Sequence, residues 1–202
     1  MKEAHELQGH NVVLTPLSLE HEEGLISAVE DGKLWEHWYT KVPSPDTMKQ
    51  AIIGHLDTTS PTPKQMYTVC DMSGKILGMT GFQSIDSENR RMQIGYTWYR
   101  KSVHNSFVNS ECKLLLLDYA FSECSALSVF FTTNSFNHKS RRALESIGAH
   151  LDGIIRNHQI LPNGLVRDTC LYSILVNEWP AVKHHLQYKI EQKSVTHDGQ
   201  EK

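Results

Sequence analysis

A polar loop that leads into an apolar helix is the first part of this sequence that could do chemistry. The stretch SVHNSFVNSECKLLLL, residues 102–117, has its last turn residues at Asn109 and Ser110 and becomes apolar at Leu114. The first turn of a helix presents backbone N–H groups and the positive end of the helix dipole, so it favours an anion. We therefore predict an anion site, such as one for phosphate, where this helix begins.

The charge around this loop also favours an anion. The whole chain has a net charge of −3. Residues 100–142 nevertheless carry only three acidic residues against six basic ones, which are Arg100, Lys101, Lys113, Lys139, Arg141 and Arg142. A second helix is expected to begin near Asn137, so a ligand in this segment would meet two helix dipoles as well as side-chain charge. The alternative is an ordinary solvated helix surface.

Ser140 is the second candidate for chemistry. If Asn137 is the N-cap of its helix, Ser140 occupies the third helical position and shares a face with Leu144 and Ile147. A hydroxyl on the inward face, one turn from a helix start, can donate a hydrogen bond to a buried ligand. The alternative is a serine that only bonds to the backbone at the cap.

Composition excludes several classes of protein. The 202 residues suffice for one large domain with a real core, and the charge of −3 argues against wholesale nucleic-acid binding. The sequence has neither a stretch of roughly 20 apolar residues nor an apolar N-terminal segment, so we expect no membrane span and no signal peptide. The histidines and cysteines lack metal-ligand spacing, which predicts no metal site. Four widely spaced cysteines in apolar stretches predict reduced thiols and a cytoplasmic protein.

Apolar periodicity predicts the elements that must position these residues. Alternation and turn residues predict strands at 11–17, 65–72, 75–85, 90–100, 126–134, 149–161 and 165–176. Helical spacing and caps predict helices at 18–30, 44–56, 109–124 and 137–148, and from 177 onward. The strand–helix–strand order in the middle implies a crossover between two parallel strands. Gly95 is expected to mark a bulge in its strand. The pattern predicts an α+β fold.

Four stretches give this sequence a family resemblance. They are NHKSRRALESIGA (137–149), IGYTWYR (94–100), VNSECKLLLLDYAF (108–121) and RDTCLYSI (167–174). Together they resemble the GNAT superfamily of acetyl-CoA-dependent N-acetyltransferases, and in particular its RimJ/RimL-like branch. The resemblance implies a mixed, mostly antiparallel seven-stranded sheet with a central βαβ crossover and flanking helices. We expect a single domain over residues 1–190 and a disordered polar tail over 191–202.

The resemblance also implies a coenzyme site. The family loop, written Q/R-x-x-G-x-G/A, places His104 at its first position, Phe107 at its first glycine and Asn109 at its last position. Without glycines, the loop is expected to bind coenzyme A less tightly, with the Phe107 ring turned outward or over the ligand. The implied coenzyme contacts are Tyr96, Trp98, His104, Asn105, Ser106, Phe107, Val108, Asn109, Ser110, Asn137 and Arg141.

The resemblance further implies catalytic and acceptor groups. Ser140 matches a serine that protonates the coenzyme A thiolate, and a backbone N–H of the IGYTWYR strand would polarise the thioester carbonyl. His158 is a candidate base, because imidazole titrates near neutral pH, although an ordinary surface histidine is the alternative. The resemblance places an aromatic gate for the acceptor at Trp35, Trp38 and Tyr39. The alternative role of these three side chains is packing in the core.

Three functions follow. The leading one is transfer of an acetyl group from acetyl-CoA, as cosubstrate, to a primary amine on a peptide N-terminus or a small molecule. The second is a degenerate GNAT protein that binds coenzyme A without efficient turnover. The third is an unrelated α+β binding domain. For the leading function we expect an amine acceptor and a possible homodimer, with no nucleic-acid or membrane partner.

Overall fold

The backbone of this computed structural model is described for residues 5–59, 64–161 and 163–198, and its side chains as far as residue 193. One mixed sheet contains the strands β1 Leu7–Gln8, β2 Val12–Pro16, β3 Gln65–Asp71, β4 Ile76–Asp86, β5 Arg91–Tyr99, β6 Ser128–Asn134, β7 His150–Ile160 and β8 Val166–Leu175. The helices are α1 Glu22–Glu30, α2 Met48–Leu56, α3 Val108–Asp118, α4 His138–Glu145 and α5 Trp179–Asp198. None of the described helices is long and apolar enough to cross a membrane.

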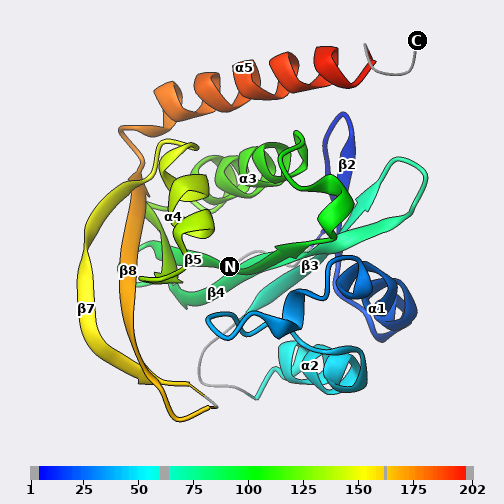
Figure 1. Cartoon of the computed structure of the whole chain (residues 1–202). Coiled ribbons are helices and arrows are strands. Elements are labelled where there is room, and N and C mark those ends of the chain that lie inside the picture. Colours follow the sequence, from blue (N-terminus) through cyan, green and yellow to red (C-terminus); the bar gives the residue numbers. More distant parts are fainter. Residues whose placement is uncertain (1–4, 60–63, 162, 199–202) are drawn as a thin grey trace.

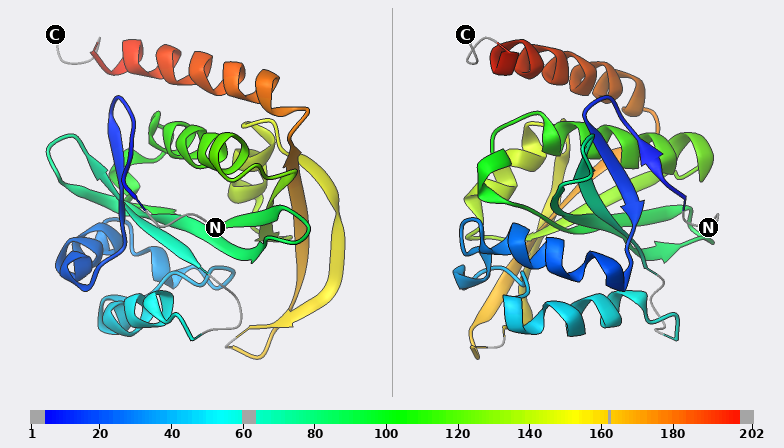
Figure 2. Two further views of the ribbon diagram at one scale, coloured as in Figure 1. Left: turned by 180° about the vertical axis from the view of Figure 1, so that it is seen from behind. Right: turned by 90° about the vertical axis from the view of Figure 1, so that its right-hand side faces the viewer.

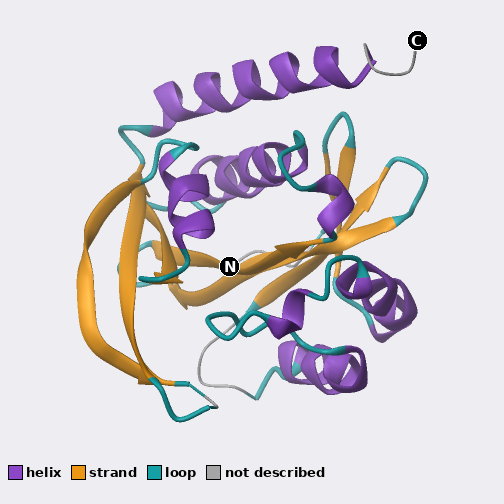
Figure 3. Ribbon diagram, in the orientation of Figure 1, coloured by secondary structure: helices purple, strands orange, loops and turns teal. Residues whose placement is uncertain are grey.

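The helices cover the sheet in two layers. Helices α1 and α2 lie on one side, whereas α3 and α4 lie on the other, with α5 running across α3 as the outermost element (Figures 1 and 2). The sheet is strongly twisted, and the long β7–β8 hairpin extends past α4 toward the level of α2 (Figure 3). Each layer of helices therefore has its own apolar interface with the sheet.

Two clusters of buried apolar side chains fill these interfaces. The larger one joins the sheet to α3, α4 and α5 and includes Tyr67, Phe82, Leu116 and Tyr172. The smaller one joins the sheet to α1 and α2 and includes Leu25, Ile52 and Trp98. The consecutive β5 residues Trp98 and Tyr99 belong to different clusters, because successive side chains of a strand point to opposite faces of the sheet.

The topology confirms the predicted fold. The strand order is β1-β2-β3-β4-β5-β6-β8-β7, with β3, β4 and β5 forming an antiparallel meander. The chain then crosses through α3 to β6, which lies parallel to β5. Ser18 begins the first helical turn with a capping box, and Ser44 does the same before α2. The sequence therefore predicted the central crossover and the helices that flank it.

Two expectations differ from the structure. Among the described residues the sheet has eight strands, not seven, because residues 7–8 form a short strand that pairs with β2. Two residues are too few to show any alternation of apolar and polar side chains. The tail expected to be disordered from residue 191 is helical as far as Asp198, since α5 continues into it. Residues 199–202 of that tail lie outside the described residues.

Candidate functional site

The parallel strands β5 and β6 pair only briefly and then diverge. Their register covers three residue pairs, from Arg91–Ser128 to Gln93–Phe130, although β5 continues to Tyr99 and β6 to Asn134. Beyond Gln93, backbone groups of β5 that would have faced β6 therefore have no partner in that strand. Diverging parallel strands of this kind can accept an extended ligand between them through backbone hydrogen bonds.

A bulge lies in β5 where the strands diverge. Gly81 pairs with Gly95 and Met79 pairs with Trp98, so Tyr96 and Thr97 together face the single residue Thr80. Tyr96 has a φ of 49°, which a non-glycine residue rarely adopts. The bulge was expected at Gly95 and lies one residue later. A bulge leaves a strand residue unpaired, so this one presents backbone groups at the divergence.

The polar loop before α3 needs no glycine in the conformation it adopts. Phe107, the residue before α3, has φ −70° and ψ −21°, which any residue can adopt. The left-handed position of the loop is Asn105, with a φ of 65°, and asparagine tolerates that region. The Ser106 hydroxyl accepts a hydrogen bond from the Val108 N–H at 3.2 Å. The loop thus reaches a helix start through a turn stabilised by the Ser106 hydroxyl instead of through glycine flexibility.

Phe107 packs inward. Its ring is half-buried against the larger core cluster, so it does not turn outward, which is one of the two orientations that we expected. Val108 and Ser110 are also buried, with 3% exposure each. Asn109 is half-buried and Asn105 is exposed. Since Phe107, Val108 and Ser110 pack inward, the loop is expected to contact an anion mainly through backbone N–H groups at the start of α3.

His104 ties this loop to its surroundings at both ring nitrogens. Its Nε2 lies 2.8 Å from the carbonyl oxygen of Tyr99, and its Nδ1 lies 2.8 Å from Lys139 Nζ on α4. Partial burial, together with Lys139, lowers the pKa of His104. The imidazole therefore acts as a connection between the loop and α4.

The basic segment is less exposed than its composition indicated. Arg100 is 9% exposed and lies 3.4 Å from Asp31. Lys113 is only 3% exposed, on the inner side of α3. The remaining basic side chains of the segment are partly or fully exposed, namely Lys101, Lys139, Arg141 and Arg142.

Lys113 lies against the diverging strands. Its Nζ is 2.9 Å from Thr97 Oγ1 on β5 and 6.0 Å from the centre of the Phe131 ring on β6. Burial lowers its pKa to about 8. No carboxylate among the described side chains forms an ion pair with it. The sequence placed this lysine in an apolar run, but nothing in its spacing indicated that it points inward.

Helix α4 presents Ser140 as predicted. Asn137 is the N-cap, and its side-chain oxygen accepts a hydrogen bond from the Ser140 N–H at 3.0 Å. Because Asn137 does the capping, the half-buried Ser140 hydroxyl is not needed for it, and no hydrogen bond joins that hydroxyl to another described residue. Arg141 instead turns back toward the sheet, where its Nε lies 3.3 Å from the Tyr172 hydroxyl.

The predicted aromatic residues have three different environments. Trp35 is half-buried against the smaller core cluster. Trp38 is 48% exposed, and its ring lies 5.8 Å from that of Phe136, just before α4. Tyr39 is half-buried and touches the Trp38 ring edge-on. The contact between Trp38 and Phe136 brings the segment after α1 to the start of α4.

The Trp98 side chain belongs to the core. It is 6% exposed within the smaller cluster, among residues of α1 and α2. The coenzyme contact predicted for Trp98 is therefore expected from its backbone. Tyr96, which is 36% exposed, is the aromatic residue of β5 that reaches the surface.

His158 lies near the end of β6. Its Nδ1 is 3.0 Å from Thr169 Oγ1, and Thr169 pairs with Asn134, the last residue of β6. Asn134 is 2% exposed, and its Nδ2 has no hydrogen-bond partner within the described part of the chain. The exposed His158 on β7 and the unpartnered Asn134 amide on β6 therefore lie on either side of β8, and Asn134 comes three residues before the Asn137 cap.

No motif in the sequence indicated a role for His55. This α2 residue lies edge-on against Tyr96, with 4.4 Å between the ring centres. Burial, with a contribution from Lys64, lowers the pKa of His55 to about 4, so the ring is neutral at physiological pH. Its Nδ1 is buried without a hydrogen-bond partner among the described residues. His55 lies between apolar residues at helical spacing, so the sequence pattern could not predict its contact with the bulge.

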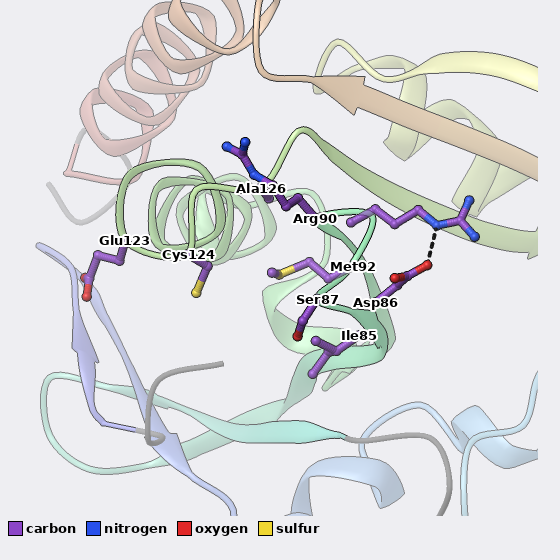
Figure 4. Close-up of a pocket in the computed structure, with 9 residues that line it drawn as sticks. Ile85, Asp86, Ser87, Arg90, Met92, Glu123, Cys124 and Ala126 are labelled. Atoms are coloured by element: carbon purple, nitrogen blue, oxygen red, sulfur yellow. Dashed lines mark hydrogen bonds and ion pairs between the residues drawn. The ribbon is translucent and has the colours of Figure 1, made fainter.

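A cavity of about 330 Å³ lies at the other end of β5. It is lined by Ile85, Asp86, Ser87, Arg90, Arg91, Met92, Glu123, Cys124 and Ala126 (Figure 4). Arg91 and Asp86 form an ion pair there, with 3.2 Å between Nε and Oδ2. This cavity adjoins the paired stretch of β5 and β6, so it is separate from the divergence.

Known proteins share both the sequence and the fold. Residues 11–150 match the model of the family described as "Acetyltransferase (GNAT) domain". The chain is 32% identical over 110 residues to "Putative ribosomal N-acetyltransferase YdaF" of Bacillus subtilis, a match that spans 54% of this chain and 59% of that protein. It is 29% identical over 105 residues to "Uncharacterized N-acetyltransferase p20" of Bacillus licheniformis, spanning 52% and 58%.

A solved structure matches almost the whole chain. The GCN5-related N-acetyltransferase from Brucella melitensis superposes with a TM-score of 0.83 at 26% identity, covering 93% of this chain and 86% of that one. The RimL structure with coenzyme A, at 18% identity and a TM-score of 0.70, shares the fold. The family match over residues 11–150 confirms the predicted resemblance to the GNAT superfamily. The diverging strands, the β5 bulge and the loop before α3 thus belong to a member of the GNAT acetyltransferase family.

Proposed function

We propose that this chain transfers the acetyl group of acetyl-CoA to a primary amine. The observation that carries the proposal is the divergence of β5 and β6 at the Tyr96 bulge, next to the start of α3. Such a gap suits an extended pantetheine arm, and a helix start suits a pyrophosphate. The resemblance to the GNAT family implies that these two features bind coenzyme A.

The proposed donor side uses backbone groups and one hydroxyl. Backbone N–H groups at the start of α3 would bind the pyrophosphate, and the Asn137 amide would contact the pantetheine arm. A backbone N–H of the bulged strand would polarise the thioester carbonyl. Ser140, whose hydroxyl is not engaged by the described residues, would protonate the departing thiolate.

The proposed reaction is a direct attack. The neutral amine nitrogen forms a bond to the thioester carbonyl carbon, and the carbon–sulfur bond then breaks. His158 would take the proton that the amine loses, while Ser140 gives a proton to the sulfur, so one amide and one thiol are formed. The neutral His55, adjacent to Tyr96, could accept a hydrogen bond from the amine.

The acceptor side lies toward α1 and α2 in this proposal. The segment that contains Trp38 and Tyr39 would gate it, because this segment contacts Phe136 at the start of α4. The name of YdaF mentions the ribosome, which favours a protein N-terminus over a small amine. That match spans 59% of YdaF. We also propose that the protein is cytoplasmic and forms a homodimer.

The second candidate is a protein that binds coenzyme A without efficient turnover. It is favoured by His104, which occupies the first position of the family loop and is bonded to Tyr99 and Lys139. A side chain held in this way has less capacity to bind the coenzyme itself.

One pair of measurements separates these functions. Acetyl-CoA would be titrated while thermal unfolding is followed, and a ligand at about 100 times its Kd should stabilise the fold by roughly 2.7 kcal/mol. Thiol release would then be measured with a panel of peptides and small amines. Stabilisation with thiol release supports the acetyltransferase, whereas stabilisation without release on any amine supports the second candidate. Absence of stabilisation contradicts both.

A further inference from the structure

Helix α5 reaches the loop that precedes α3. It runs across α3 as the outermost layer of the molecule (Figures 1 and 2). Near its C-terminal end, Lys193 Nζ donates hydrogen bonds to the carbonyl oxygens of Asn105 at 2.8 Å and Ser106 at 3.0 Å. The family domain matches residues 11–150, so this contact comes from a helix outside the matched region.

These two hydrogen bonds fix the direction of two peptide groups. In a trans peptide, the carbonyl and the N–H of the next residue point in opposite directions. Because Lys193 draws the carbonyls of Asn105 and Ser106 toward α5, the N–H groups of Ser106 and Phe107 point away from α5. The Ser106 N–H donates to the Val103 carbonyl oxygen there, at 3.4 Å. The Phe107 N–H therefore leaves the loop on the side opposite to α5, at the residue that begins α3.

Lys193 also stabilises the most strained residue of the loop. Asn105 has a φ of 65°, and its carbonyl is one of the two that Lys193 binds. A left-handed residue in an exposed loop is maintained only if its surroundings favour it. The half-buried ammonium supplies that constraint, and it adds positive charge beside a helix start that already favours an anion.

A neighbouring lysine of the same helix makes a useful contrast. Lys189 Nζ donates to the backbone oxygen of Ser146 at 2.7 Å and to its hydroxyl at 3.1 Å. Ser146 lies at the C-terminal end of α4, away from the start of either α3 or α4. Lys189 and Lys193 thus anchor α5 in a similar way, but only Lys193 holds the loop.

We propose that Lys193 is a positioning residue for the coenzyme, holding the glycine-free loop so that the N–H groups at the start of α3 face the pyrophosphate. This rests on the proposed function, since the ligand is the pyrophosphate of acetyl-CoA. In the family motif, flexible glycines let the loop backbone adopt the conformation that binds the pyrophosphate. In this chain, Lys193 holds the loop backbone in place from outside the loop.

The test compares Lys193→Met with Lys193→Arg and with the control Lys189→Met. Methionine preserves the length of the side chain and removes both donors, whereas arginine restores them. Lys193→Met should weaken acetyl-CoA binding about tenfold, which is the usual effect of losing hydrogen bonds from a charged donor. The kcat and the KM for the amine should stay within about twofold, because neither depends on the loop once acetyl-CoA is bound. Lys193→Arg should recover most of the affinity, and Lys189→Met should keep it.

A truncated donor distinguishes positioning from a general structural effect. S-acetylpantetheine carries the thioester but no pyrophosphate, so the parent protein and Lys193→Met should acetylate an amine from it at equal rates. Lower rates with both donors would show that Lys193 only maintains the fold and would overturn the inference. Equal or tighter acetyl-CoA binding by Lys193→Met would overturn it as well, while leaving the proposed function intact. Failure of the parent to bind acetyl-CoA would overturn the proposed function and the inference together.

Discussion

Lys139 and His104 form a hydrogen bond of 2.8 Å that joins the first turn of α4 to the loop before α3. An ammonium group can only donate, so His104 Nδ1 must accept. The Tyr99 carbonyl can only accept, so Nε2 must carry the proton. These two partners fix both the tautomer and the neutral state of the ring. A protonated imidazole would have to break its bond to Lys139.

Acidification should therefore loosen this loop. Burial, with a contribution from Lys139, lowers the pKa of His104 in the folded protein. The unfolded chain binds this proton more readily, so stability is present above about pH 6.5 and is lost as the pH falls through the folded pKa. His104→Gln has no titrating group there. The melting temperature of the parent should fall relative to that of the variant between about pH 7 and pH 5. Parallel curves would show that folding does not lower the pKa of His104.

Phe107→Gly should not improve coenzyme binding, although it restores the glycine of the family loop. The Phe107 backbone is already helical, and its ring packs on the larger core cluster. Removing a half-buried ring should cost about 1–2 kcal/mol and lower the melting temperature. Asn105→Gly is the matched control, because glycine adopts a φ of 65° without strain and the Asn105 side chain is exposed. A tighter complex of Phe107→Gly with acetyl-CoA would contradict this explanation of the loop.

The sequence predicted the elements of this fold because most of them carry a strong local pattern. The β3–β4–β5 meander alternates, α4 has an Asn137 cap and a Gly148 end, and the crossover follows from the order of elements. The two-residue β1 was missed because it is too short to alternate. The helical tail was missed because its polarity resembles that of a disordered segment. Local pattern therefore determined element type but not every boundary.

The candidate site was predicted less completely, because its side chains depend on tertiary packing. Ser140 has the predicted place in α4, since a cap fixes the positions that follow it. The inward direction of Phe107 and Lys113 depends on how α3 lies on the sheet, which no spacing within α3 reveals. The contact of His55 with Tyr96 joins residues from α2 and β5, so it could not be found from the pattern of either element.

Lys113→Met should stabilise the protein at neutral pH. The ammonium is 3% exposed, and burial lowers its pKa from 10.5 to about 8. A shift of this size corresponds to a cost on the order of 3 kcal/mol when the lysine is charged. The Thr80 and Thr97 hydroxyls lie 2.8 Å apart, so they can bond to each other without the lysine. The variant should therefore unfold at a higher denaturant concentration at about pH 7.

The pH dependence checks the cause of that stabilisation. Since the folded pKa of Lys113 is depressed, the unfolded chain holds more protons between about pH 8 and 10.5, and the parent gains stability as the pH rises through this range. The advantage of Lys113→Met should be largest below about pH 8 and should shrink toward pH 10. A variant less stable than the parent at neutral pH would mean that the threonine hydrogen bonds outweigh the desolvation.

Ser140→Ala should lower turnover while leaving acetyl-CoA affinity nearly unchanged. A group that protonates the leaving thiolate acts in the transition state, so its loss should reduce kcat by about tenfold or more. The Asn137 side chain bonds to the backbone of Ser140, so the cap survives the substitution. Ser146→Ala, at the other end of α4, is the control and should retain the parent kcat. Equal turnover in Ser140→Ala and the parent would remove Ser140 from the mechanism.

His158→Gln should lower turnover while leaving acetyl-CoA affinity nearly unchanged. If His158 takes the proton of the amine, it acts in the transition state, so its loss should reduce kcat by about tenfold or more. Glutamine can keep a hydrogen bond to Thr169, which lies 3.0 Å from the ring, so the strand pairing should persist. The kcat would be measured with saturating acetyl-CoA and one amine. A kcat of His158→Gln equal to that of the parent would assign the proton to water or to another group.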